Sequence, residues 1–308
     1  MAVEAQDAYR QCRAIAQAHY ENFPVASRLL PARLRDPVAA IYVFARRADD
    51  HADEGTREAG DRFAALDTMA AALDATFAGE PPDDPLWHAL GDTVARFGLP
   101  AAPFHDLLSA FRQDVTTRGY ADFAALRDYC RRSADPVGRL LLHLHGRPTA
   151  AQLAASDCIC TGLQLVNFLQ DLHQDWGERG RLYIPRTDLD CHGVTGMFLR
   201  TGTADPAVDA LMNHQVERAA AWLYAGRHLP DSLRGRFRIE IRLILRGGWA
   251  AIERLRAEKP GNPHARPRLR ARERRWIARG LLPGPVLTGV QPPRGVPANE
   301  CPADVSME

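Results

Sequence analysis

The chain has 308 residues, of which 46% are hydrophobic, and its formal net charge at pH 7 is +1. A chain of this length can bury a sizeable core, and a near-zero net charge argues against a partner bound by overall charge, such as nucleic acid. The six cysteines are irregularly spaced, the first residues lack the apolar run of a signal peptide, and no stretch of about 18 apolar residues occurs. We therefore expect a cytoplasmic protein without a membrane-spanning helix, for which only peripheral membrane contact stays open.

The predicted elements begin with a helix over residues 5–20, which ends before Phe23 and Pro24 interrupt the helical pattern. Asp36 and Pro37 have the sequence of an N-cap followed by the first helical residue, which predicts a second helix through about residue 54. Apolar residues recur along this second helix at helical spacing. The pattern indicates a helix packed against a core on one side.

Two aspartates lie near the end of the second helix. Asp49 and Asp53 are four residues apart, so their carboxylates share one face, with Cβ atoms about 5–6 Å apart. The helix dipole disfavours anions in a last turn, and Asp50 adds a third carboxylate that repels the other two. A site that binds cations would account for this unfavourable placement.

The rest of the body also has helical periodicity. It continues over residues 58–79, 85–97, 103–116, 121–132 and 137–145, over a long helix capped by Thr149 and extending to about Trp176, and over 206–228 and 231–258. On the long helix, Asn167, Asp171 and Asp175 form a polar stripe because each follows the previous one by four residues. No alternating strand pattern competes, and no G-x-G-x-x-G or Walker-type loop occurs. The sequence therefore predicts an all-α protein without a nucleotide-binding fold.

The composition changes after residue 258. Residues 260–308 hold eight arginines against four acidic residues and are rich in proline. This pattern predicts a poorly ordered, solvated tail over 259–308, which follows a single helical domain over 1–258. Binding of nucleic acid or of an anionic lipid surface by the arginines is the alternative.

The two Asp-x-x-x-Asp pairs predict a magnesium site if their helices face each other. Mg²⁺ prefers carboxylate and water oxygens, and usually binds through one or two protein carboxylates together with substrate phosphates. Beside an apolar cavity, such a site suits removal of diphosphate from an allylic or cyclopropylcarbinyl carbon. The metal neutralises the leaving group, and the cavity shields the carbocation from water.

Other interpretations of these residues stay open. Solvated acidic helix faces are the ordinary explanation of a single aspartate pair. Arg46 lies three residues before Asp49 and can either form an ion pair with it or contact a phosphate. Tyr42 lies one turn earlier and can be a core residue or a phosphate donor.

Two further chemistries have weaker support. His51 and His173 lie beside the aspartate pairs and would suit a His-Asp phosphohydrolase, but no further His-Asp arrangement supports that class. Cys158 and Cys160 form a close pair without the additional ligands that a zinc site needs, so we expect buried thiols rather than a metal centre.

The two aspartate motifs resemble those of the squalene and phytoene synthases, which are all-helical isoprenoid synthases that use Mg²⁺. Residues 42–53, YVFARRADDHAD, resemble the first motif of that family, and residues 164–175, QLVNFLQDLHQD, resemble the second. The resemblance covers about residues 9–258. It implies an isoprenoid synthase helical bundle with a central apolar cavity and an isoprenoid diphosphate as substrate.

The resemblance also implies roles for individual residues. The resemblance implies that the catalytic residues are Asp49, Asp53, Asp171, Asp175 and Tyr129. It implies that Mg²⁺ is bound by Asp49, Asp53, Asn167, Asp171 and Asp175. The implied substrate-binding residues are Phe23, Tyr42, Arg46, Gln164, Asn167, Arg181 and Tyr183.

Residues 19–27 and 129–138 are similar to the hydroxysqualene synthase branch of this family, which serves bacterial hopanoid biosynthesis. That branch is implied to take presqualene diphosphate, rearrange the cation and quench it with water. Polar residues from Ser133 to Pro136 stand where other members have small apolar ones, and can admit a water. Head-to-head condensation of two farnesyl diphosphates is the alternative within the family. A non-catalytic helical scaffold whose basic tail binds RNA or a membrane is the alternative of another class, and the oligomeric state is not predicted.

Overall fold

The computed structural model describes residues 2–18, 30–53, 58–196, 205–257 and 271–278, together with 281, 284–287, 289–290, 292–296 and 300. Over these residues every regular element is a helix, and extended backbone pairs only at an isolated parallel bridge between Gly119 and Leu182. The all-α class predicted from the sequence is confirmed.

The chain divides into two compact units. Unit 1 comprises residues 1–116 and 136–148, and unit 2 comprises residues 117–135 and 149–308. The first aspartate pair therefore belongs to unit 1 and the second to unit 2. The single domain over 1–258 stays a prediction.

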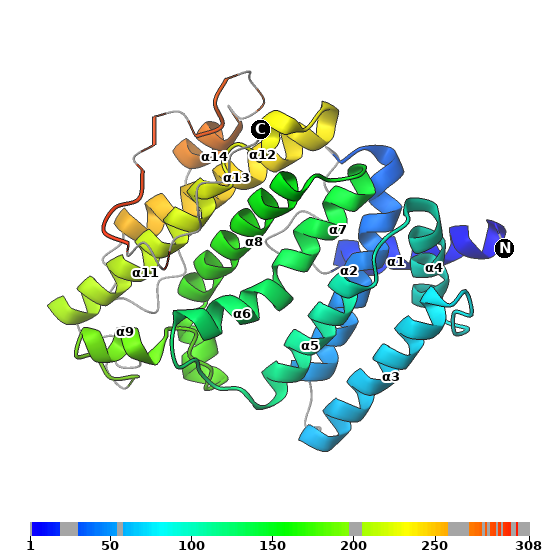
Figure 1. Cartoon of the computed structure of the whole chain (residues 1–308), viewed down its shortest axis with the longest axis horizontal. Helices are drawn as coiled ribbons and strands as arrows, with labels where there is room; N and C mark the ends of the chain where they lie inside the picture. The colour runs from blue at the N-terminus through cyan, green and yellow to red at the C-terminus, as the bar shows by residue number, and fades with distance from the viewer. Residues whose placement is uncertain are drawn as a thin grey trace. The chain divides into compact units, whose positions relative to one another are not determined.

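Helix α2 lies at the centre of unit 1. The helices of this unit are α1 (Ala2–Ala18), α2 (Ala32–Asp53), α3 (Ala59–Phe77), α4 (Pro85–Phe97), α5 (Ala102–Thr116) and most of α7 (Asp135–His145). α2 packs against α1, α3, α4 and α5 (Figure 1). The buried ring of Phe44 meets Trp87 and Phe104 edge-on, with centroid distances of 6.0 and 5.3 Å. These contacts fix the helix that carries Asp49 and Asp53.

Helix α2 begins at Ala32 rather than at Pro37, so the predicted start is wrong. Asp36 does not cap the helix, because it lies inside it and its carboxylate forms an ion pair with Arg13 of α1. Pro37 lacks the N–H that would bond to the preceding turn, a loss that usually ends a helix. Pro37 is buried, and packing of the apolar side of α2 offsets the missing hydrogen bond.

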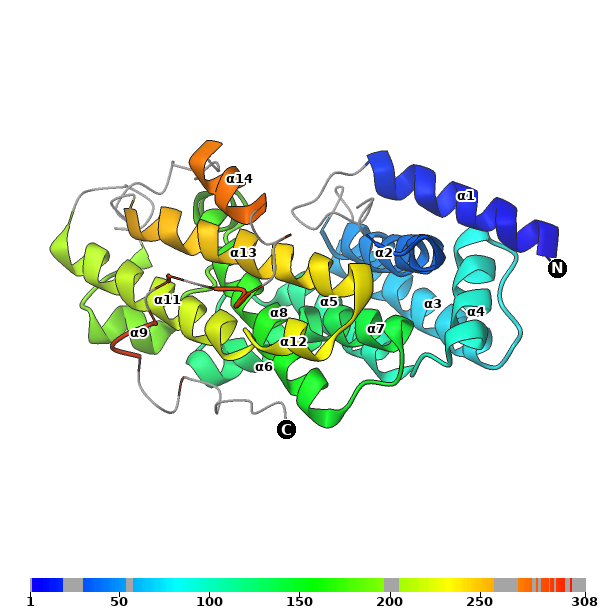
Figure 2. The same ribbon diagram turned by 90° about the horizontal axis from the view of Figure 1, so that it is seen from above.

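Unit 2 is built around three helices. Its helical elements are α6 (Phe123–Ser133), α8 (Ala150–Gln170), the π-helical turn η1 (His173–Glu178), α9 (Arg186–Cys191), α11 (Pro206–Ala225), α12 (Leu229–Ser232), α13 (Gly235–Ala257) and α14 (Ala271–Ala278). α8, α11 and α13 lie side by side (Figures 1 and 2). A Cβ at Gly162 of α8 would lie 2.6 Å from the backbone nitrogen of Leu223 of α11. Glycine therefore permits the close approach of these two helices.

Replacing Gly162 with alanine is expected to destabilise the protein by about 1–3 kcal/mol, because the new methyl group overlaps the backbone of α11. Gly247→Ala is the matched control, since a Cβ at this helical position meets no atom within 4 Å. Removing a glycine from the interior of α13 should stabilise the protein by about 0.5–1 kcal/mol. Urea denaturation of the three proteins measures both effects. A Gly162→Ala protein as stable as wild type would contradict the close contact.

The long helix of unit 2 begins as predicted but ends early. Thr149 and Gln152 form a capping box at the start of α8. The predicted extension to Trp176 is wrong as an α-helix, because α8 ends at Gln170 and a π-helical turn follows. The wider turn lets the N–H of Arg179 reach the carbonyl of Gln174, five residues earlier. Such turns have no periodic sequence pattern that distinguishes them from a continuing helix.

The described residues after 258 contact unit 2. α14 packs against α13, where the Arg246 guanidinium lies over the Trp276 ring at 4.1 Å. Val286 and Leu287 are buried. At these positions the segment adds to the core of unit 2; the predicted poor order of the tail as a whole stays a prediction.

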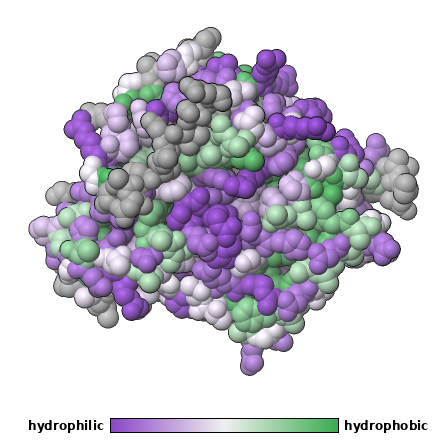
Figure 3. Space-filling model, viewed as in Figure 1, coloured by the Kyte–Doolittle hydropathy of each residue, from purple (hydrophilic) through white to green (hydrophobic). Residues whose placement is uncertain are grey.

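Hydrophilic and hydrophobic residues are interspersed over the face of the molecule drawn in Figure 3. Among the described residues, Ile15 and Leu281 are the large hydrophobic side chains that are exposed. None of the helices that the structure describes combines the length and the apolar character needed to cross a bilayer.

Candidate functional site

The first aspartate pair lies in the last two turns of α2. Asp49, Asp50 and Asp53 are all half-buried. The guanidinium of Arg46 lies 2.7 Å from the Asp50 carboxylate and 3.8 Å from that of Asp49. Of the two roles considered for Arg46, the ion pair is present, but its shorter contact is with the aspartate outside the Asp-x-x-x-Asp pair.

Two further predicted substrate-binding residues belong to the N-terminal part of the chain. Tyr42 lies one turn before Arg46 on α2 and is half-buried. Phe23, with the rest of the segment 19–27, lies outside the described residues. The roles of Tyr42 and Phe23 stay predictions.

In unit 2, the second motif forms a stripe along α8 and the turn that follows it. The N–H of Asp171 donates to the carbonyl of Asn167 at 2.9 Å, and the N–H of Asp175 donates to the carbonyl of Asp171 at 2.8 Å. Because each hydrogen bond spans four residues, the three side chains follow one another at successive turns. The three residues keep the predicted spacing, but the prediction that they lie on one helix is wrong, because α8 ends at Gln170 and Asp175 belongs to the π-helical turn η1.

The π-helical turn η1 fixes the last member of the stripe. Asp175 is buried, and its carboxylate lies 3.4 Å from the guanidinium of Arg179. The N–H of Arg181, which is also buried, donates to the carbonyl of Asp175 at 2.8 Å. Trp176 donates its indole N–H to the carbonyl of Gly196 at 2.8 Å. Backbone and side-chain contacts thus both hold the turn in place. Turns of this π-helical type are frequent at functional sites.

Four aromatic rings gather beside the stripe. Phe168 and Tyr183 stack, with ring centroids 3.8 Å apart and an angle of 4° between the planes. Tyr129 lies 6.0 Å from Tyr183, and Tyr120 lies 5.9 Å from Tyr183 and 5.5 Å from Tyr129. The structure thus brings the predicted residues Tyr129 and Tyr183 together. Tyr120 and Phe168 were not predicted; the Gly119–Leu182 bridge that holds Tyr120 beside Tyr183 has no local sequence signal.

A small pocket that is partly open to solvent lies next to these rings. It is lined by Leu165, Phe168, Leu169, Leu172, Tyr183, Ile184 and Gln215. Leu165, Phe168 and Leu169 belong to α8 and Leu172 follows it, so this part of the pocket wall comes from the segment that also carries Asn167 and Asp171. Gln164, also on α8, is half-buried one turn before Phe168. Gln215 was not predicted, because it lies on α11 without any surrounding motif.

A buried carboxyl group lies at the start of α7. The side chain of Asp135 has no exposure to solvent and accepts hydrogen bonds from the Thr161 hydroxyl and from Arg127, both at 2.8 Å. Burial raises the pKa of Asp135 to about 7, although Arg127 and Thr161 oppose the rise. Asp135 belongs to the polar segment from Ser133 to Pro136 that the sequence singles out.

The raised pKa of Asp135 predicts that stability falls as pH rises. Between the ordinary aspartate pKa and about 7, the folded protein binds a proton at Asp135 that the unfolded chain has released. The free energy of unfolding therefore decreases by up to about 4 kcal/mol through this window and is level above it. Denaturation of wild type and Asp135→Asn between about pH 5.5 and 8 measures the effect. We expect a smaller slope in the variant, and equal slopes would contradict the raised pKa.

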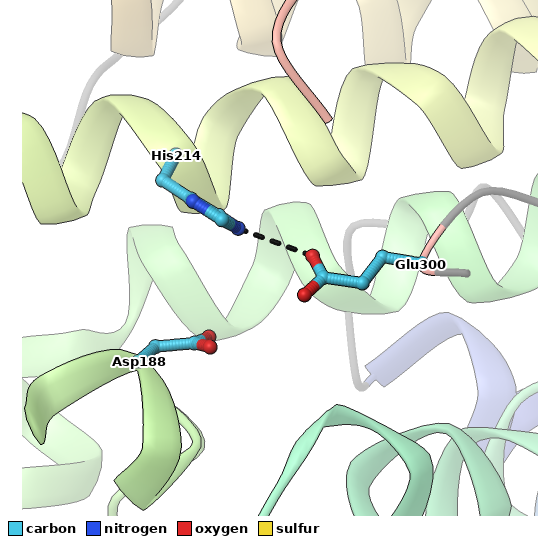
Figure 4. Close-up of side chains that lie close together, drawn as sticks. All are labelled: Asp188, His214 and Glu300. Carbon is cyan, nitrogen blue, oxygen red and sulfur yellow. Dashed lines mark hydrogen bonds and ion pairs between the residues drawn. The ribbon is translucent and has the colours of Figure 1, made fainter. Parts of the chain in front are cut away.

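Asp188, His214 and Glu300 converge from α9, α11 and the C-terminal segment (Figure 4). One ligand atom from each residue lies within 4.8 Å of the other two, a spacing that would suit a metal ion. However, Arg218 lies among them, with guanidinium nitrogens 2.6 Å from the Asp188 carboxylate and 2.5 Å from that of Glu300. Arg218 thus supplies the cation, and we interpret this cluster as an internal ion pair rather than a metal centre.

Comparison with known proteins agrees with this architecture. Residues 16–273 match the family model of squalene/phytoene synthases. The chain is 37% identical to a hydroxysqualene synthase of Rhodopseudomonas palustris over 73% of this chain and 75% of that protein. It is 34% identical to a phytoene synthase of Mycobacterium bovis over 75% of this chain and 76% of that protein. The crystal structure of squalene synthase HpnC from Alicyclobacillus acidocaldarius has a TM-score of 0.79 and 38% identity, over 85% of this chain and 97% of that chain. The chain therefore belongs to the squalene/phytoene synthase family.

Proposed function

We propose that this protein converts presqualene diphosphate into hydroxysqualene, using Mg²⁺. The observation that carries the proposal is that Asn167 of α8, Asp171 at its C-terminal end and Asp175 of η1 follow one another beside the wall of an apolar pocket. Ionising a diphosphate ester requires oxygen ligands for a metal-bound leaving group, and the carbocation that remains requires a dry surface. The relative named a hydroxysqualene synthase supports this branch of the family.

The chemistry of the donor set fits Mg²⁺. Asp171, Asp175 and Asn167 offer carboxylate and amide oxygens, the hard ligands that Mg²⁺ prefers. In the proposal, these residues hold the ion and the diphosphate, and Asp49 and Asp53 of unit 1 are also metal ligands. When bound, Mg²⁺ supplies positive charge that stabilises the departing diphosphate.

The remaining predicted polar residues act on the same end of the substrate. The phenol of Tyr42 and the guanidinium groups of Arg46 and Arg181 donate hydrogen bonds to phosphate oxygens. The amide of Gln164 lines the site near them. Arg181 is buried, which gives its charge a stronger interaction with a phosphate than an exposed arginine would have. Such contacts orient the scissile carbon–oxygen bond toward the pocket.

The aromatic rings act on the hydrocarbon end. Breaking the carbon–oxygen bond leaves diphosphate and a C30 cation, and ring faces attract a cation at close range. Phe168, Tyr183 and Tyr129 form one cluster that offers such faces. After rearrangement, a water oxygen forms the new carbon–oxygen bond and the water gives up one proton, so the products are hydroxysqualene, diphosphate and H⁺.

Condensation of two farnesyl diphosphates is the second candidate function. The similarity to a structure described as a squalene synthase favours it, because that chain is 38% identical to this one and the relative named a hydroxysqualene synthase is 37% identical. Both reactions ionise a diphosphate ester at an aspartate-rich site. They differ in the substrate, and this difference can be tested directly.

The proposal is tested by product analysis. Purified protein is incubated with Mg²⁺ and either presqualene diphosphate or farnesyl diphosphate, with and without NADPH, and the extracts are resolved by gas chromatography with mass detection. A C30 alcohol from presqualene diphosphate without NADPH is the expected result, and chelation of the metal should abolish it. Turnover of farnesyl diphosphate alone would assign the chain to the condensing branch. No product from either substrate would contradict both functions.

A further inference from the structure

Glu300 of the C-terminal segment reaches a buried ion pair inside unit 2. Arg218 of α11 is fully buried, and its guanidinium lies between two carboxylates that come from distant parts of the chain. Asp188 of α9 accepts from Nη1 at 2.6 Å, and Glu300 accepts from Nε at 2.8 Å and from Nη2 at 2.5 Å. Trp222, one turn after Arg218, donates its indole N–H to the backbone carbonyl of Glu300 at 2.8 Å.

The charge of Arg218 requires both carboxylates. A guanidinium that is removed from water loses its hydration and must find acceptors within the protein. Without Glu300, Nε would have no acceptor among the hydrogen bonds described for Arg218, and one carboxylate would remain to balance the charge. His214 lies 3.1 Å from Glu300 and 2.9 Å from Arg218 and completes the contacts of this carboxylate. Glu300 is therefore part of the buried ion pair and not a surface charge.

The same ion pair holds one residue of the pocket wall. Gln215 lines the pocket and is buried. Its side-chain N–H donates to Asp188 at 2.8 Å, and its side-chain oxygen accepts from Arg218 at 2.9 Å. Burial favours a higher pKa for Asp188, but hydrogen bonds from Arg218 and Gln215 hold the pKa of this carboxyl group below its usual value. Asp188 thus stays ionised, and both polar ends of the Gln215 amide are fixed by it and by Arg218.

We propose that Glu300 is a positioning residue for the pocket, which acts through Arg218 on the side chain of Gln215. The inference rests on the proposed function, in which this pocket takes the hydrocarbon end of an isoprenoid diphosphate. Residue 300 lies beyond residues 16–273, the part of the chain that matches the family model. The C-terminal segment thereby contributes to a site whose other residues come from the family's common part.

The test is steady-state kinetics of full-length Glu300→Gln, with the diphosphate that the wild-type protein turns over. Loss of the charge releases Arg218 and Gln215, so KM should rise on the order of tenfold while kcat stays within about twofold. A purely structural role would instead lower the amount of active protein, which reduces the apparent kcat without changing KM. Glu253→Gln is the matched control, because it removes an exposed carboxylate that also pairs with an arginine, Arg256, at 2.8 Å.

A spectroscopic readout reports on the docking of Glu300 itself. Trp222 touches the backbone of Glu300, so Glu300→Gln should change the tryptophan emission, and the change should vanish in a Trp222→Phe background. An unchanged KM, or no emission change that depends on Trp222, would overturn the inference. A wild-type protein that is inactive on presqualene and farnesyl diphosphates would instead contradict the proposed function, so the two failures are distinguishable.

Discussion

Replacing Asp171 with asparagine is expected to lower kcat/KM about a thousandfold while the protein stays folded, because a lost metal-binding carboxylate removes several kcal/mol of transition-state stabilisation. Asp171 lies at the C-terminal end of α8, in the middle of the stripe between Asn167 and Asp175. Asp49→Asn, in the other motif, should have a similar effect. Steady-state rates at increasing Mg²⁺ concentration measure both variants, and each should need more metal than wild type for its residual activity.

The two motifs are further tested by combining the variants. If Asp49 and Asp171 serve one metal-bound diphosphate, the double variant should lose much less activity than the product of the two single losses. Asp190→Asn is the control, since Asp190 is an exposed carboxylate on α9 outside both motifs. Full activity of Asp171→Asn, or strictly multiplicative losses in the double variant, would contradict the proposed roles of these aspartates.

Replacing Arg218 with methionine is expected to destabilise the protein by about 3–5 kcal/mol, the cost of removing one partner from a buried ion pair. The variant leaves the carboxylates of Asp188 and Glu300 inside the protein without the cation between them. Chemical denaturation of the purified variant measures the loss. The loss in the free energy of unfolding should be larger than the loss caused by any single substitution in an exposed ion pair of unit 2.

A triple variant separates charge from packing at this cluster. Arg218→Met combined with Asp188→Asn and Glu300→Gln removes all three charges, so it should be more stable than Arg218→Met alone. A single variant as stable as wild type would show that Arg218 does not hold the cluster. A triple variant less stable than the single one would show that the carboxylates stabilise the fold by some other contact.

Elements whose signals are local were predictable from the sequence. α4 occupies residues 85–97 as predicted, because the Asp84 carboxylate accepts from the N–H of Leu86 and Gly98 adopts a positive φ of 61° at the other end. The stripe through Asp171 was predictable for the same reason, since residues four apart share a helix face. A local rule failed at Pro37, where packing of α2 outweighs the hydrogen bond that proline removes.

Contacts between distant segments were not predictable. Glu300 and Arg218 are separated by 82 residues. From composition alone, Glu300 is one acidic residue in a basic, proline-rich tail. Gln215 reaches the pocket from α11, and Tyr120 joins the aromatic rings through an isolated bridge. The aspartate spacing predicts where oxygen ligands gather, but the wall of the pocket depends on how α8, α11 and the segment with Tyr183 and Ile184 pack.

The origin of the product oxygen tests the central claim most directly. Presqualene diphosphate is incubated with the protein and Mg²⁺ in water enriched in oxygen-18, and the C30 alcohol is examined by mass spectrometry. Breaking the carbon–oxygen bond and quenching the rearranged cation with water predicts hydroxysqualene that carries one oxygen-18 atom. An unlabelled alcohol with the carbon skeleton of the substrate would mean that the phosphorus–oxygen bond was hydrolysed instead, and would contradict the account.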